Sequence, residues 1–147
     1  MEAIFSPFVS AVPIVHLAAT WGMVGVIWFV QVVHYPLFNG VGKELFPEYS
    51  KRNANRTTYV VLPLMLIEAA TASALLFMVP EHQQHLAQLA AFLLVLVWAS
   101  TFLIQVPLHE RLQRGFEPSI HTSLVRSNWI RTVLWSVRGL AACSMLP

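Results

Sequence analysis

The sequence predicts an all-α protein, a membrane-embedded four-helix bundle made of two tandem helical hairpins. Three observations support this fold class. Hydrophobic residues make up 56% of the 147 residues and charged residues only 11%, and the mean hydropathy is +0.62. Four stretches are long and apolar enough to cross a bilayer, and one polar motif occurs once in each half of the chain. Because a soluble domain carries about 25% charged residues, the composition excludes an ordinary water-soluble enzyme.

Length and charge limit the organisation further. The length fits one domain, residues 1–147. Cys143 is the only cysteine, which excludes a disulfide within the chain. The formal net charge is +2 without a basic face in the pattern, so we expect no nucleic acid as a partner. The expected partners are the lipid bilayer and a lipophilic small molecule, and a second copy of the chain or a larger membrane complex is left open.

The first predicted hairpin consists of membrane helices over residues 8–38 and 57–79. A membrane helix needs about 20 mostly apolar residues, and both stretches meet that length. The first stretch is too long, and too acidic at its start, for a cleavable signal peptide. Pro63 lies inside the second helix and predicts a kink. The polar members are His16, Gln31 and His34 in the first helix and Glu68 in the second.

The second predicted hairpin consists of membrane helices over residues 86–108 and 124–146. Pro36 in the first hairpin and Pro107 in the second are expected near helix ends, where a proline disturbs little. The polar members are Gln88 and Gln105 in the third helix and Asn128, Arg131 and Arg138 in the fourth.

The distribution of basic residues predicts the orientation. The connection between helices two and three, residues 80–85, contains no Lys or Arg, whereas the other two connections and their edges hold seven. Because cytoplasmic loops of membrane proteins are enriched in Lys and Arg, we expect residues 39–56 and 109–123 in the cytoplasm and both termini outside. A bacterial inner membrane fits this arrangement. The seven basic residues are Lys43, Lys51, Arg52, Arg56, Arg111, Arg114 and Arg126.

An internal repeat appears when residue i is compared with residue i+75. The pattern His-x18-Asn-x2-Arg-Thr occurs at residues 34–57 and again at residues 109–132. A Gln-Val pair precedes each histidine, at Gln31 and Gln105. Parallel repeats of this kind predict two hairpins related by an axis along the membrane normal. The motif residues would then meet at the cytoplasmic side, unless they only cap the helix ends and contact lipid headgroups.

Two charged residues are expected to pair inside the membrane. Glu68 and Arg138 lie about eleven and about fourteen residues into helices that rise from the cytoplasmic side, which places them at similar depth at ~1.5 Å per residue. Ionisable groups inside a bilayer are costly and usually have a partner or a role. The pair could staple two helices, or Glu68 could carry protons while Arg138 anchors a substrate.

The remaining polar residues suggest a ligand pocket. His34 or His109 could act as a base, and the polar neighbours could bind the ligand and hold a developing negative charge. Tryptophans on the same helices would supply flat apolar walls for an aromatic or quinone-like molecule. The alternatives are haem or a metal held between His34 and His109, or histidines that only stabilise the fold. The expected ligand-binding residues are Gln31, Tyr35, Arg56, Gln105, Asn128, Arg131 and Arg138.

The second half of the chain resembles the anthrone-oxygenase-like family of small four-helix membrane proteins. The resemblance rests on Gln105-Val-Pro-Leu-His-Glu-Arg-Leu followed by Asn128-Trp-Ile-Arg-Thr. The family typically shows Asn-Val-Pro-Leu-Asn, so Gln105 and His109 stand where it has asparagine. Some members oxidise anthrones to anthraquinones without a known cofactor, and many bacterial members have no assigned role. The resemblance implies a small membrane oxidoreductase or oxygenase. An electron-transfer subunit with haem or metal, or a non-catalytic membrane subunit, is the alternative.

Overall fold

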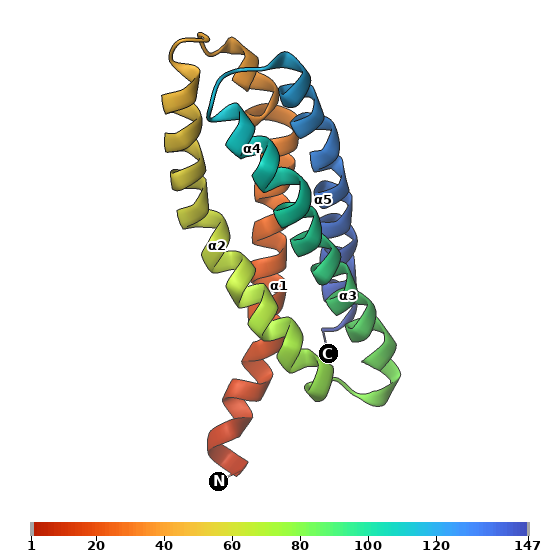
Figure 1. Cartoon of the computed structure of the whole chain (residues 1–147). Coiled ribbons are helices and arrows are strands. Elements are labelled where there is room, and N and C mark those ends of the chain that lie inside the picture. The colour runs from red at the N-terminus through yellow and green to blue at the C-terminus, as the bar shows by residue number, and fades with distance from the viewer. Residues whose placement is uncertain (1, 147) are drawn as a thin grey trace.

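A computed structural model describes residues 2–146, with side chains from residue 11 onward, and this part of the chain is helical without a β-strand (Figure 1). The predicted all-α class is therefore confirmed. The first half contains α1 (Glu2–Phe29), the π-helix η1 (Val30–His34), the 3₁₀-helix η2 (Pro36–Gly40) and α2 (Phe46–Met78). The second half contains η3 (Glu81–Gln83), α3 (Gln84–Ser100), the π-helix η4 (Thr101–Gln105), α4 (Val106–Leu112) and α5 (Pro118–Ser144).

Three helical segments are long and apolar enough to cross a membrane: Ala11–Gly40, Phe46–Met78 and Glu81–Leu112. α5 is long enough but less apolar. Polar side chains in its middle and second half face inward, because Asn128, Arg131 and Arg138 are buried. Its outward side is apolar and exposed at Trp129, Ile130, Val133, Val137 and Leu140.

The helices lie side by side along a common direction (Figure 1). α1 packs against α2 and α5, and α3 packs against α5 and α2. The connections 41–45 and 113–117 lie at one end, which we call the basic end because it carries the seven basic residues counted above, and the connection before η3 lies at the other (Figure 1). The buried apolar side chains form three clusters stacked between these ends. The first two clusters include Tyr35 and Trp135, which also line the polar site described below.

The second helix begins much earlier than the sequence predicted. α2 starts at Phe46 rather than near residue 57, so most of the expected 39–56 connection is helical. Phe46 and Ser50 are buried while Lys51 and Arg52 are exposed. A search for uniformly apolar stretches misses such an amphipathic beginning. In the same way, α4 extends to Leu112, and α5 begins at Pro118.

The expectation that Pro36 and Pro107 disturb little was wrong. Each proline lies two residues after the end of a π-helical turn, at Val30–His34 and Thr101–Gln105. A proline ring clashes with the carbonyl four residues earlier, and the wider π turn relieves that clash. The turn lets the Tyr35 N–H bond to Val30, five residues earlier, at 2.9 Å. Turns of this kind are frequently found at functional sites.

Pro63 lies within α2 as predicted, and Figure 1 shows this helix changing direction near its middle. Proline has no N–H for the carbonyl four residues before it, so it bends a helix. The bend lies beside the cavity described next, to which α2 contributes residues from Asn53 to Met65.

Candidate functional site

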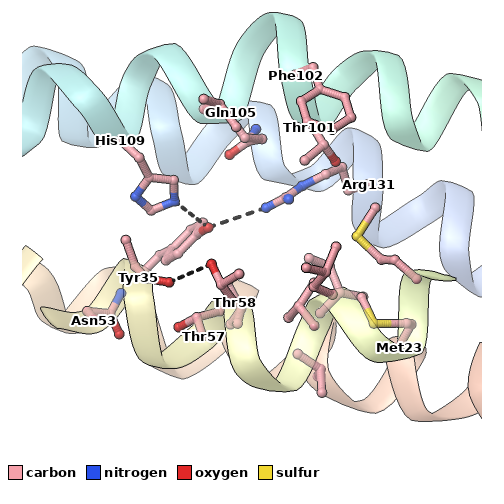
Figure 2. A pocket seen from close by; sticks show the side chains of 18 of the residues that line it. Met23, Tyr35, Asn53, Thr57, Thr58, Thr101, Phe102, Gln105, His109 and Arg131 are labelled. Carbon is pink, nitrogen blue, oxygen red and sulfur yellow. Dashed lines mark hydrogen bonds between the residues drawn. The ribbon is translucent and has the colours of Figure 1, made fainter. Parts of the chain in front are cut away.

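The hydroxyl of Tyr35 forms the centre of the candidate site. It lies 2.8 Å from Nε2 of His109, and Nη2 of Arg131 donates to it at 3.3 Å (Figure 2). Tyr35 joins η1 to η2, His109 lies on α4 and Arg131 lies on α5. Tyr35 and Arg131 are 6% and 7% exposed, so the polar group is shielded from solvent. Three segments distant in sequence therefore meet at one hydroxyl.

The hydrogen-bond pattern indicates how the protons are arranged. A tyrosine hydroxyl has one hydrogen to donate and can also accept. Because Arg131 donates to the Tyr35 oxygen, the Tyr35 hydrogen is free to point at Nε2 of His109. His109 then accepts at Nε2 and carries its own hydrogen on Nδ1. This arrangement holds the Tyr35 hydroxyl between an acceptor, His109, and a donor, Arg131.

A chain of amides holds Arg131 in place. Nε of Arg131 donates to Oδ1 of Asn128 at 3.0 Å, and Nδ2 of Asn128 donates to Oε1 of Gln31 at 2.9 Å. Gln31 in turn donates to the carbonyl of Val125 at 3.1 Å. Gln31 and Asn128 are buried, so these hydrogen bonds are made away from water. The predicted grouping of Gln31, Asn128 and Arg131 is confirmed.

Arg131 carries a positive charge without a carboxylate partner. Among the described residues, no Asp or Glu oxygen lies within 4.0 Å of its guanidinium. Its recorded side-chain partners, Asn128 and Tyr35, are both neutral. A buried cation with only neutral partners favours a negatively charged or strongly polarised oxygen beside it.

The site borders a cavity of about 430 Å³. One wall comes from α1, η1 and α2, and the other from α3, η4 and α4, with Arg131 and Trp135 of α5 behind them. The rim residues Thr58, Leu62, Phe102 and Val106 are exposed, so the cavity opens sideways between α2 and α3–α4. The lining combines apolar side chains with polar groups on both walls, such as Asn53 and Thr58 on α2 and Gln105 and His109 opposite them (Figure 2). Its apolar members include Met23, Ile27, Val61, Met65 and Trp98.

Three buried polar atoms on the cavity residues have no partner in the described part of the chain: Oε1 of Gln105, Nε1 of Trp98 and Nδ1 of His109. Gln105 is 1% exposed and its Nε2 donates to Ser127, which leaves Oε1 free as an acceptor. Figure 2 shows the Gln105 side chain directed toward Tyr35. Nε1 of Trp98 is a buried donor without an acceptor. Because unpaired buried polar atoms are costly, these three atoms suit a ligand that carries both hydrogen-bond donors and acceptors.

The other motif residues are placed differently. His34 lines the same cavity as His109, but its Nε2 lies 2.8 Å from Oδ1 of Asn53 rather than at the Tyr35 hydroxyl. Arg56 lies on the exposed side of α2, beside a second hollow, and does not join Arg131. The structure therefore brings together the two histidines but not the two arginines.

The predicted pairing of Glu68 with Arg138 is confirmed. Nη2 of Arg138 lies 3.0 Å from Oε1 of Glu68, and both side chains are fully buried. Trp135 donates to the second oxygen of Glu68 at 2.9 Å, and Arg138 also donates to the carbonyl of Ala90. Glu68 and Arg138 do not line the cavity. Trp135 does, so it separates the ion pair from the cavity.

Sequence reasoning missed several contributors. His121 Nε2 lies 2.8 Å from the carbonyl of Tyr35, and Ser127 accepts from Gln105. Both lie on the inward side of α5. Ser127 is one turn before Arg131, and His121 is two turns before Asn128. Their spacing from Asn128 and Arg131 was the available signal.

Metal ligands are not grouped in the described part of the chain, where no three His, Cys, Asp or Glu side chains come together. His34 and His109 are the two imidazoles that line the cavity. Each has its Nε2 in a hydrogen bond, to Asn53 and to Tyr35. Ligation through these nitrogens would have to replace both bonds.

Comparison with known proteins adds no relative, because no family model, curated protein or solved structure matches the chain.

Proposed function

We propose that this chain is an integral membrane oxidoreductase acting on a lipophilic aromatic or quinone-like molecule bound in the cavity. The observation that carries the proposal is the Tyr35 hydroxyl, bonded to His109 and Arg131 at the edge of the cavity. The sideways opening between apolar helices suits a ligand that arrives from lipid. The unpaired charge of Arg131 suits a ligand oxygen that becomes negative during reaction.

The proposed membrane form is a four-helix bundle of two tandem hairpins, with α5 as the fourth span. The apolar outward side of α5 from Trp129 to Leu140 supports this. The basic end would face the cytoplasm. Cysteine labelling in intact cells tests the orientation: a cysteine at Gln83 is expected to react from outside and one at Gln113 to be protected. The reverse labelling would overturn it.

The proposed chemistry is oxidation of an acidic methylene group to a carbonyl by dioxygen. The Tyr35 hydroxyl takes a proton from the methylene of an anthrone-like ketone as it passes its own proton to Nε2 of His109, which later returns it to the peroxide. Arg131 stabilises the enolate oxygen. The carbanion combines with dioxygen and a proton to form a hydroperoxide, and loss of water gives the second carbonyl. In sum, CH₂ and O₂ become C=O and H₂O.

Oxygen uptake with anthrone as probe tests this proposal in the detergent-purified protein. Anthraquinone is expected to form with one O₂ consumed per product. Tyr35→Phe removes the hydroxyl and keeps the ring, so the rate should fall about 10²- to 10³-fold. Tyr59→Phe is the matched control, since Tyr59 is 80% exposed outside the cavity. Absence of uptake by the unaltered protein, or equal rates in the two variants, would overturn the proposal.

Haem binding is the second candidate, favoured by the two histidines that line one cavity. A visible spectrum of the purified protein separates the candidates. A Soret band that disappears in His34→Ala and in His109→Ala would support haem, whereas a colourless protein that oxidises anthrone supports the first proposal.

A further inference from the structure

A second hollow, of about 480 Å³, lies at the basic end on the outer side of α2. It is framed by the 41–45 connection and the first turns of α2. We propose that this hollow binds the headgroup of an anionic phospholipid, with Arg52 and Arg56 on the phosphate and the acyl chains along α2. Lipid binding there requires no reaction in the cavity, so the inference stands independently of the proposed function.

The charges in the hollow are available to an anion. Arg52 and Arg56 are four residues apart, so they share one face of α2. The carboxylate of Glu48 lies 3.6 Å from Arg52, but 68% and 76% of these side chains are exposed, and such pairs contribute little. No carboxylate lies within 4.0 Å of Arg56 in the described part of the chain. Two guanidinium groups can therefore meet one phosphate in the forked geometry that arginine favours.

The surroundings favour a lipid over a free phosphate ion. Leu45, at the edge of the hollow, is 70% exposed, and Tyr49 presents part of its ring there. Immediately beyond Arg56 the outer side of α2 becomes apolar, with Tyr59 and Val60 exposed. Arg56 thus lies at the boundary between the charged and the apolar surface of α2. A phospholipid has the same order, with its phosphate next to the start of its apolar chains.

The hollow also adjoins the ligand cavity. Asn53 lines both, and its Oδ1 is hydrogen-bonded to His34. A lipid held by Arg52 and Arg56 would steady the turns of α2 that carry Asn53. The phosphate site and the cavity therefore share one wall.

Native mass spectrometry of the detergent-purified protein tests the site. Phosphatidylglycerol and phosphatidylcholine with identical acyl chains are offered in turn. We expect the protein to retain phosphatidylglycerol about 30-fold more, since two basic contacts with an anionic lipid contribute about 1 kcal/mol each. Arg52→Gln/Arg56→Gln should abolish the preference. Arg111→Gln/Arg114→Gln, which removes two charges from the last turn of α4 and the 113–117 connection at the same end, should keep it.

Several outcomes would overturn the inference. Equal loss of preference in the two double variants would mean that overall charge, not this hollow, attracts the lipid. Equal retention of both lipids by the unaltered protein would mean that only acyl chains bind. Displacement of phosphatidylglycerol by millimolar inorganic phosphate would mean a free-phosphate site. Arg52→Lys/Arg56→Lys keeps the charge and should retain an intermediate preference, and a circular-dichroism melt shows whether each variant folds.

Discussion

Residues 34–57 and 109–132 share one motif, but the structure uses the two copies differently. Arg131 of the second copy is 7% exposed and bonded inside the protein, whereas Arg56 of the first copy lies on the outer surface of α2. Identical residues at matching positions therefore have opposite surroundings. The motif specifies similar backbones, and the neighbouring helices decide which side chains become buried.

The histidines and asparagines show the same asymmetry. His34 bonds to Asn53 within its own copy. His109 bonds instead to Tyr35, and Asn128 bonds to Gln31, so the second copy is completed by residues of the first hairpin. The candidate site is thus made by contacts between the halves of the chain and is not duplicated with the motif.

The reason lies in the packing. α5 is covered by α1, α3 and α4, which surround the second copy of the motif. The cavity lies between α2 and α4, and it leaves the first copy with one open side. α2, which contains Pro63, contacts α3 and α4 but leaves the cavity between them.

The largest expected change in stability concerns Glu68 and Arg138, which lie outside the repeated motif. In the i to i+75 comparison, Arg138 corresponds to Pro63, so the first half of the chain has no equivalent arginine. Replacing Glu68 or Arg138 alone by leucine should lower the free energy of unfolding by about 3–5 kcal/mol, because a buried charge loses its partner. The double replacement should cost less than either single one. Thermal unfolding in one detergent measures this, with exposed Arg126→Gln as control. If the double variant loses the sum of the two singles, the pair does not act as a unit.

The two motif arginines give the next largest contrast. Arg131→Gln should lower the rate of anthrone oxidation about 10²- to 10³-fold, because the stabilising charge beside Tyr35 is lost. Arg56→Gln should change the rate by no more than about twofold, as an exposed substitution. Comparable losses in both would show that the copies contribute alike, contrary to the asymmetry described here.

Much of the fold followed from the sequence. Apolar runs predicted the helical class, and helix rise predicted that Glu68 and Arg138 meet, since depth in a long helix depends only on residue count. The repeat predicted that His34 and His109 face one region, and both line the cavity. These successes depend on local periodicity and length.

The rest depended on tertiary packing. The central role of Tyr35 arises from its contacts with His109 and Arg131, which lie 74 and 96 residues away. The early start of α2 was missed because its first turns are amphipathic. The sequence could not predict that Arg56 lies outside the cavity, because the motif is identical in both copies and only the neighbouring helices differ.

The motif asparagines provide the smallest and sharpest test of the asymmetry. Asn128→Ala removes a fully buried amide and leaves Oε1 of Gln31 and Nε of Arg131 without those partners. Unsatisfied buried groups cost about 1–3 kcal/mol each, so the free energy of unfolding should fall by at least that amount. Asn53→Ala removes one bond, to half-buried His34, and should cost about 0.5–1.5 kcal/mol. The two variants carry the same chemical change at matching motif positions, so chain composition and helix propensity cancel in the comparison. Equal destabilisation would mean that both copies are equally enclosed, and the distinction between an inner and an outer copy would fail.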